Sequence, residues 1–271
     1  MPQSDYVLGH DVREQLRLIR QAQVLAPGTE LFLRDAGIVG RLRVLDIGCG
    51  MGDVAMLAAR LVGPEGIVLA IDRDQASVET ARRRAAAAGL DNITAEQADL
   101  SAFTEAAPFD AVIGRLVLEF QPDPVATIGR LCGLLRPGGI LALQEPSWRI
   151  WLAATAHLPL RMAVTTLIRD VFVAGGVHTE MELPLYRGFK AAALTAPQLR
   201  LDLPIGDGPE MRGLLHDLLL AVRPRAEALG LPLAALGDPA TLAARLEEEL
   251  DAEGSFASFV ALVGAFARKR A

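Results

Sequence analysis

Lysine, cysteine and aromatic residues are scarce in this chain of 271 residues. Only Lys190 and Lys269 are lysines among 27 basic residues, and the net charge is −6. The isoelectric point is near 5.3. A surface that binds nucleic acid needs clustered positive charge, so the composition argues against a nucleic-acid partner.

Three further absences narrow the class of protein. The two cysteines, Cys49 and Cys132, are too few for a disulfide framework or a metal-binding set. No apolar run is long enough to span a membrane, and residues 1–8 lack the basic and apolar segments of a signal peptide. We therefore expect a cytoplasmic protein with no membrane partner and no metal.

The most informative segment is Val44-Leu45-Asp46-Ile47-Gly48-Cys49-Gly50-Met51-Gly52. A short apolar stretch typical of a strand leads into three glycines at alternate positions, and a helical pattern follows. Glycine accepts a positive φ and lacks the Cβ that would keep a ligand away. This layout is typical of a nucleotide-handling α/β site.

Strand and helix patterns alternate after this turn. Strands are predicted at 43–47, 67–72, 92–97, 109–115 and 140–145, with helices at 53–62, 75–88 and 123–135 between them. Such alternation predicts right-handed βαβ units and a parallel sheet. Ligands of these sheets bind beyond the carboxyl ends of the strands.

The pattern differs on either side of this core. Two helices are predicted before it, at 11–25 and 29–36, because Pro27 separates them. After residue 146 the chain is mostly helical, with strands at 198–204 and 256–267. We predict a single domain over 1–271, with a helical cap at 1–40, a cofactor-binding core at 41–146 and helical lid insertions at 147–178 and 209–253.

The spacing of the glycines favours one kind of nucleotide over another. A dinucleotide fingerprint has the form Gly-x-Gly-x-x-Gly and holds a pyrophosphate, whereas here the glycines stand at 48, 50 and 52. Asp46 precedes them and Asp53 follows, and carboxylates suit a cationic ligand better than a pyrophosphate. Asp72, 20 residues after Gly52, ends the next strand and can accept hydrogen bonds from ribose hydroxyls.

These residues resemble the signature of the class I S-adenosylmethionine-dependent methyltransferases. Other landmarks of that family follow in order: Asp72, Ala98-Asp99-Leu100, Phe109-Asp110-Ala111-Val112 and Leu135-Arg136-Pro137-Gly138-Gly139. The resemblance covers residues 44–145. It is greatest to enzymes acting on small molecules, as in quinone biosynthesis and secondary metabolism. It implies a Rossmann-like α/β fold with seven strands, mostly parallel, helices on both faces and the last strand antiparallel.

The resemblance also implies S-adenosylmethionine as cofactor and a set of residues that bind it. Asp46 would face the ammonium, Asp72 the ribose, Asp99 and Leu100 the adenine, and Arg115 and Leu116 the sulfonium. The full expected set is Tyr6, Gln21, Asp46, Gly48, Cys49, Gly50, Asp72, Arg73, Ala98, Asp99, Leu100, Arg115 and Leu116.

Methyl transfer is an in-line displacement at a sulfonium carbon, and the acceptor needs at most one general base. Our candidates for that base are Glu119, Glu145 and His178. Either glutamate could instead be a buried structural acceptor. We predict methylation of an O or C atom of a small, largely apolar metabolite.

Three alternatives stay open at this point. The same fold could bind S-adenosylmethionine and catalyse a cyclisation without methylation. A nicotinamide-dependent reductase is disfavoured by the glycine spacing, and a binding protein without activity would show no turnover.

The apolar stripes of the lid segments, such as Leu214, Leu215, Leu218, Leu219 and Val222, predict either core packing or a homodimer face.

Overall fold

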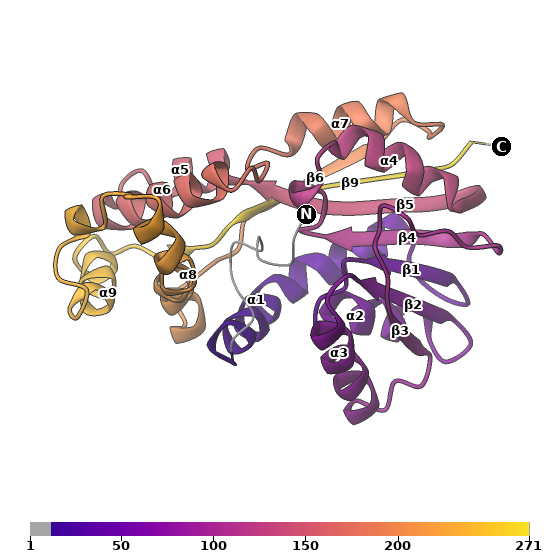
Figure 1. Ribbon diagram of the computed structural model, residues 1–271, viewed down its shortest axis with the longest axis horizontal. Coiled ribbons are helices and arrows are strands. Elements are labelled where there is room, and N and C mark those ends of the chain that lie inside the picture. The colour runs from indigo at the N-terminus through magenta and orange to yellow at the C-terminus, as the bar shows by residue number, and fades with distance from the viewer. Residues whose placement is uncertain (1–11, 271) are drawn as a thin grey trace. The chain divides into compact units, whose positions relative to one another are not determined.

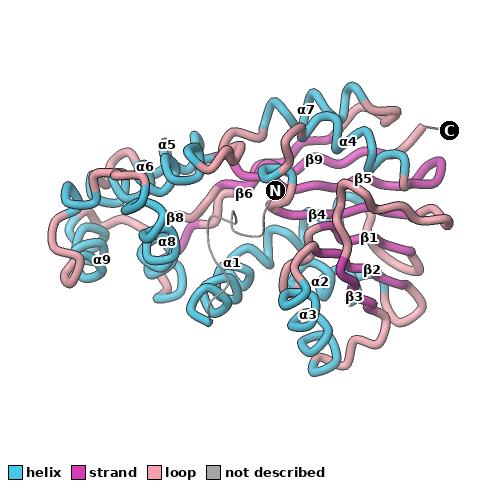
Figure 2. The backbone as a smooth tube through the Cα atoms, viewed as in Figure 1, coloured by secondary structure: helices cyan, strands magenta, loops and turns pink. Residues whose placement is uncertain are grey.

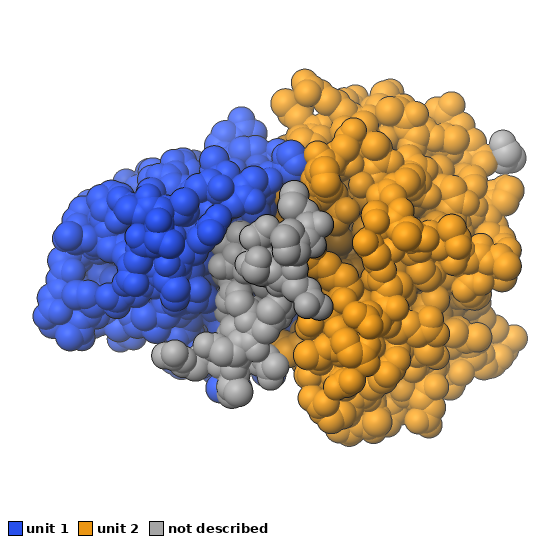
Figure 3. Space-filling view, in the orientation of Figure 1, with its two compact units in different colours: residues 1–25, 147–180, 203–261 blue, residues 26–146, 181–202, 262–271 orange. Residues whose placement is uncertain are grey.

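The computed structural model describes residues 12–270 and divides into two compact units (Figures 1 and 3). The sheet unit comprises residues 26–146, 181–202 and 262–271, and the helical unit comprises residues 1–25, 147–180 and 203–261. Each unit therefore combines segments that are distant in sequence. Tyr6 lies outside the described residues.

The sheet unit is built on seven strands in the order β3-β2-β1-β4-β5-β9-β6 (Figure 2). β1, β2, β3, β4 and β5 pair in parallel, whereas β6 and β9 pair antiparallel. This confirms the predicted sheet. The strands are β1 (Arg43–Ile47), β2 (Ile67–Asp72), β3 (Ile93–Gln97), β4 (Phe109–Arg115), β5 (Leu135–Ser147), β6 (Gln198–Asp202) and β9 (Ala261–Arg268).

Helices cover both faces of this sheet. Alternate residues of a strand point to opposite faces, so Val44 packs toward α1 (Val12–Ala36), α2 (Asp53–Val62) and α3 (Gln75–Ala87). Leu45 packs toward α4 (Pro124–Gly133) and α7 (Glu182–Ala191). Burial on both faces explains why the parallel strands read as continuous apolar runs.

The predicted break at Pro27 is wrong, because α1 continues through it. Proline costs a helix one hydrogen bond and crowds the preceding turn. Here apolar residues on both sides of Pro27 are buried, with Leu25 and Phe32 at most 2% exposed. Packing of the whole helix therefore outweighs the local cost.

The predicted start of the fifth strand at residue 140 is also too late. β5 begins at Leu135, which pairs with Phe109 before the register shifts and Ala111 pairs with Ile140. This irregularity in the hydrogen-bond ladder between β4 and β5 accommodates the Pro137-Gly138-Gly139 turn within the strand.

The helical unit contains the first half of α1 and the elements that follow β5 other than α7, β6 and β9. Its helices bury the predicted leucine stripes: Leu214, Leu218 and Val222 are at most 3% exposed, as are Val164 and Ile168. These stripes therefore form a core between helices that contact each other. The elements are α5 (Trp148–Thr155), α6 (Pro159–Ala174), α8 (Pro209–Ala228), η2 (Leu233–Leu236), α9 (Leu242–Ala252), and the ribbon of β7 (Ile205–Gly206) and β8 (Ala257–Ser258).

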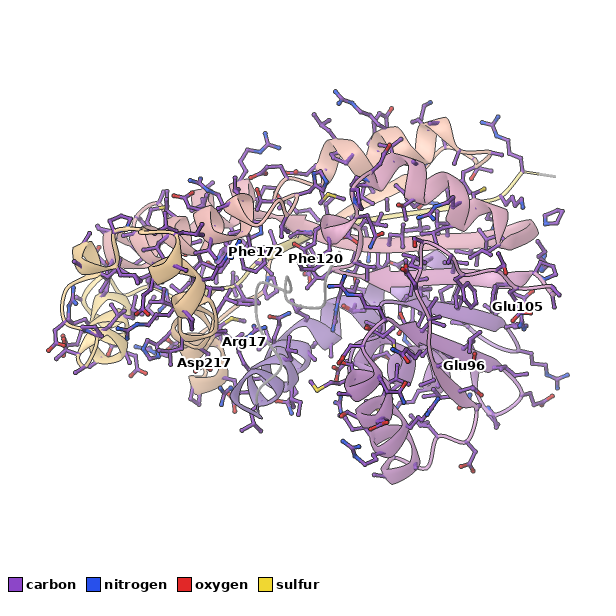
Figure 4. The ribbon with its side chains drawn as sticks, in the orientation of Figure 1. Arg17, Glu96, Glu105, Phe120, Phe172 and Asp217 are labelled. Atoms are coloured by element: carbon purple, nitrogen blue, oxygen red, sulfur yellow. The ribbon has the colours of Figure 1, made fainter. Side chains whose placement is uncertain are left out.

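An aromatic cluster completes the core of the helical unit. The ring of Trp148 lies 5.2 Å from Trp151 and 5.1 Å from Phe172, which Figure 4 labels on α6. Trp151 contacts Phe259 and donates from its indole nitrogen to the carbonyl of Ser258. Among the described residues, no helix is long and apolar enough to cross a membrane.

Candidate active site at the carboxyl edge of the sheet

The glycine turn after β1 has the conformation that only glycine adopts readily. Gly48, Gly50 and Gly52 have φ of 57°, 51° and 85°. A Cβ on Gly48 would lie 2.6 Å from a methyl group of Val117, and one on Gly52 would lie 3.0 Å from Ala81. A Cβ on Gly50 would meet nothing within 4 Å. The backbone of Gly50 therefore faces open space, where a ligand can approach it.

Asp46 is a buried carboxylate beneath this turn. It is 1% exposed, and its Oδ2 has no hydrogen-bond partner among the described residues. Burial raises its pKa to about 8, an effect that Arg115 partly offsets and Asp72 reinforces. A cationic ligand beside Asp46 would supply the missing partner and restore the charged form.

Asp53 does not share that role, contrary to the reading of its position in the sequence. Its Oδ1 accepts from Nη2 of Arg84 at 2.7 Å, and another nitrogen of Arg84 donates to the carbonyl of Met51. The charge of Asp53 is thus balanced by Arg84 of α3. Of the two acids that flank the glycines, Asp46 is the one with a buried oxygen that has no hydrogen-bond partner among the described residues.

Asp72 ends β2 and holds the glycine turn in place. Its Oδ2 accepts from the backbone nitrogen of Gly50 at 2.8 Å, and its Oδ1 accepts from that of Asp74. The amide of Cys49 donates to Ile71 and that of Ala98 donates to Asp72, both at 2.9 Å. The segments after β1, β2 and β3 therefore converge on Asp72, whose oxygens have further lone pairs for hydroxyl donors.

The remaining predicted adenine residues lie at the rim of this edge. Asp99 and Arg73 are exposed, and Leu100 is half-buried. Asp99 accepts from the backbone of Ser101, and this hydrogen bond lowers its pKa. Cys49 is buried, and burial raises the pKa of its thiol, so it is not a nucleophile.

Arg115 and Leu116 occupy the end of β4. Arg115 donates to the hydroxyl of Thr29 on α1 at 2.9 Å. Leu116 has a φ of 59°, and it is the one residue other than glycine with a positive φ in the described chain. Strain of this kind persists where the surroundings enforce it and is concentrated at functional sites.

The two glutamates of the site differ sharply in their surroundings. Both oxygens of Glu145 are used: Oε1 accepts from the amides of Val117 and Leu118, and Oε2 from that of Glu119. Burial raises its pKa to about 7 despite these bonds. Glu145 thus anchors η1 (Leu118–Phe120), the turn that Phe120 marks in Figure 4.

Glu119 lies beside Glu145 and is 4% exposed. Burial, and then the charge of Glu145, raise its pKa well above the ordinary value. Burial therefore favours the protonated form of this carboxyl group.

Two predicted residues belong to the helical unit rather than to this edge. Gln21 accepts from Arg17 at 2.6 Å within α1. His178 is half-buried in the loop after α6.

Sequence reasoning missed Arg84, Thr29 and Gln144. Gln144 follows the apolar run 140–143 of β5 and is buried, and a polar residue at that point is a signal that the sequence does contain.

The fold and the site together define a Rossmann-like α/β protein that holds a nucleoside at the carboxyl ends of its strands. The described residues contain no group of three potential metal ligands. Comparison with known families narrows this class. A model described as "Methyltransferase domain" matches residues 38–175, just over half of the chain, and the chain belongs to this family.

Relatives of known name agree with this family. Trans-aconitate 2-methyltransferase of Methylobacterium radiotolerans is 34% identical over 174 residues, which is 62% of either chain. Nocamycin O-methyltransferase of Saccharothrix syringae is 35% identical over 193 residues, 69% of this chain and 65% of that protein. The match thus spans less than two thirds of each relative.

A solved structure from Bacillus halodurans shares the fold with a TM-score of 0.60 at 16% identity, over 90% of this chain and 99% of that one. Members of the class I methyltransferases use S-adenosylmethionine as methyl donor. The residues of this site fit that molecule. The unpartnered Oδ2 of Asp46 suits its ammonium group, and the open backbone of Gly50 leaves room for its chain.

Proposed function

We propose that this chain transfers a methyl group from S-adenosylmethionine to an O or C atom of a small, largely apolar metabolite. Membership of the methyltransferase family supports the reaction class. The observation that carries the proposal is the buried carboxylate of Asp46, which has an oxygen without a partner directly below an open glycine turn.

When bound, the cofactor supplies an electrophilic methyl group on a sulfonium. The chain supplies binding and orientation. We assign Asp46 to the ammonium, the backbone of Gly48, Cys49 and Gly50 to the methionine portion, and Asp72 to the ribose. Arg73, Ala98, Asp99 and Leu100 are assigned to the adenine side, Arg115 and Leu116 to the sulfonium side, and Tyr6 and Gln21 to the cap.

The candidate bases take different roles in this proposal. Glu145 spends both oxygens on three backbone amides, so we assign it to positioning η1. Glu119 is the candidate base, and burial raises the pKa of its carboxyl group. His178 stays a second candidate, since the loop that carries it belongs to the helical unit.

Calorimetry with S-adenosylhomocysteine tests the cofactor assignment directly. We expect saturable binding to the wild type, weakened by Asp46→Asn. Absence of binding to the wild type would overturn the proposed function. Incubation with S-adenosylmethionine and a panel of hydroxylated aromatic and polyketide-like acceptors then tests the reaction by mass spectrometry.

The mass of the product separates methylation from the cyclisation alternative. A gain of one methyl group supports methylation. A rearranged product of unchanged mass would assign the same site to a cyclase.

The helical unit carries the part of the proposal that concerns the acceptor. We propose that segments 147–178 and 209–253 form the lid over the acceptor, with residues 1–40 as the cap of a single catalytic domain. We further propose a cytoplasmic protein that acts on small molecules rather than nucleic acid, with a homodimer face on the lid helices. Leu220 and Val173, about half exposed on α8 and α6, are candidates for that face; light scattering of Leu220→Glu tests it.

A further inference from the structure

A cavity of about 250 Å³ opens on the sheet unit, and none of the residues assigned to the cofactor line it. It lies between α1 and the strands β5, β9 and β6. Both apolar and polar residues line it: Gly28, Leu31, Phe32, Gln144, Arg200, Leu201, Asp202 and Leu262. We call it the Gln144–Asp202 pocket. A space of roughly 150 Å³ accepts a benzene ring, so this pocket can hold one ring with a short substituent.

Gln144 lines the pocket and carries a buried hydrogen-bond acceptor without a partner among the described residues. The residue is 2% exposed, and its Oε1 has no hydrogen-bond partner among the described residues. A buried acceptor without a hydrogen bond lowers stability by about 1–3 kcal/mol. A ligand that donates a hydrogen bond here would remove that cost.

The charges around the pocket also favour a donor. Asp202 faces Gly28 so closely that a Cβ at residue 28 would overlap its Oδ2. Burial raises the pKa of Asp202, and Arg200 opposes the shift. Arg200 is itself ion-paired with Asp35. These three charges sum to one negative charge, which disfavours an anionic ligand.

The strand register joins the pocket to the cofactor residues. Gln144 pairs with Arg115 of β4, and Asp46 of β1 pairs with Ile113, two residues before Arg115. Asp46, Arg115 and Gln144 therefore point to the same face, that of α1, from three adjacent strands. Neighbouring strands are about 4.8 Å apart and two residues of a strand rise about 6.6 Å, so the backbone of Gln144 lies about 12 Å from that of Asp46.

We propose that the Gln144–Asp202 pocket anchors the methyl acceptor through a hydroxyl or amino group that donates to Gln144 and Asp202. This inference rests on the proposed function for the identity of the ligand as acceptor. Phe32, Leu31 and Leu262 supply the apolar walls for its ring. A ligand carboxylate at the same place would be repelled by the lone pairs of Gln144 and by the negative charge of Asp202.

Fluorine NMR with three probes tests the pocket without any cofactor. We expect 4-fluorobenzyl alcohol and 4-fluorobenzylamine to bind the wild type, and 4-fluorobenzoate to bind about tenfold more weakly or not at all. Gln144→Leu should weaken binding of the alcohol about fivefold, which corresponds to the loss of one hydrogen bond. Equal binding of all three probes, or no binding of the alcohol and the amine, would overturn the proposal.

A matched pair of variants locates the binding. Leu31→Trp places bulk at the pocket from a side chain that is 54% exposed, and it should abolish binding of the probes. Leu199→Trp makes the same change at a residue that is 48% exposed and does not line the pocket, and it should leave binding unchanged. Equal effects of the two variants would contradict the location.

The thermal melt of Gln144→Leu guards against a misfolded variant. Removal of a buried acceptor without a partner leaves the melting temperature unchanged or raises it. If Gln144→Leu melts at a lower temperature than the wild type, the test uses Asp202→Asn instead. This variant should weaken binding of the amine more than binding of the alcohol. The opposite order in that variant would overturn the role of Asp202.

The two proposals fail separately. Calorimetry with S-adenosylhomocysteine reports on the cofactor site, and the NMR titration reports on the pocket. Once an acceptor is known, Gln144→Leu should raise its KM about fivefold. An effect confined to kcat would show that the pocket does not anchor the acceptor.

Discussion

The backbone amide of Leu118 donates to the carboxylate of Glu145 at 2.9 Å and so joins the turn after β4 to the end of β5. Two further amides, of Val117 and Glu119, donate to the same carboxylate. The conformation of η1 thus depends on one buried acid whose pKa is raised to about 7. A titration near neutrality therefore acts on the turn that carries Glu119.

The first prediction concerns stability as a function of pH. The pKa of Glu145 rises from 4.5 to about 7 on folding, so the folded state binds the proton more tightly than the unfolded state. Its contribution to stability is full below pH 4.5 and is lost as pH rises to about 7. Between pH 5 and pH 8, chemical denaturation should show that the wild type loses on the order of 2–3 kcal/mol more stability than Glu145→Gln. Parallel pH profiles for the two proteins would contradict this.

The second prediction sets stability against cofactor affinity at Asp46. Above pH 8 the wild type buries a charge with an unpartnered oxygen, so Asp46→Asn should raise the free energy of unfolding by about 2 kcal/mol at pH 9. The same variant should bind S-adenosylhomocysteine about tenfold more weakly. Asp53→Asn is the control. It breaks the ion pair with Arg84 and should not stabilise the protein. A gain in stability for Asp53→Asn alone would reverse the assignment.

The third prediction separates two glycines of one turn. Gly50→Ala places a methyl group in open space, so it should cost only the left-handed strain of about 1–2 kcal/mol while it blocks the cofactor. Gly48→Ala carries the same strain and also a clash with Val117, and it should unfold at lower denaturant than Gly50→Ala. Calorimetry on folded Gly50→Ala tests the ligand contact; undiminished binding would refute it.

The fourth prediction concerns the rate of methyl transfer to a hydroxyl acceptor. Because burial raises the pKa of Glu119, a rate that depends on its carboxylate as base should rise with pH through that raised pKa. Glu119→Gln should lower kcat by a factor on the order of 100 and remove this pH dependence. Glu119→Asp serves as the variant that retains an acid. A pH profile unchanged in Glu119→Gln would remove Glu119 from the chemistry.

The sequence allowed the prediction of those parts of the fold that local pattern determines. The apolar runs and glycine turns locate β1, β2 and β4, and the spacing of Asp46 and Asp72 places both at one edge. Pairings across long sequence distances were not predictable. The ion pair of Asp53 with Arg84, 31 residues away, removed one of the two acids on which the argument for a cationic ligand was built.

The pocket shows the same limit more strongly. Gln144 and Asp202 are separated by 58 residues, and only the insertion of β9 between β5 and β6 brings their strands to one cavity. A glutamine directly after an apolar run is a signal of a polar site, but no neighbouring residue in the sequence indicates which residue lies across the pocket from it. Likewise, the continuation of α1 through Pro27 depends on buried contacts that no local rule contains.

The place of β9 in the sheet has a consequence for synthesis of the chain. Among the described strands, β6 pairs only with β9, which is synthesised after β6 because it follows it in the chain. Until then the edge of β5 is open and β6 lacks a pairing partner, so the nascent chain exposes an apolar strand edge that is prone to pair with other chains. Addition of β9, rather than formation of the glycine turn, therefore completes the sheet on which both proposed binding sites depend.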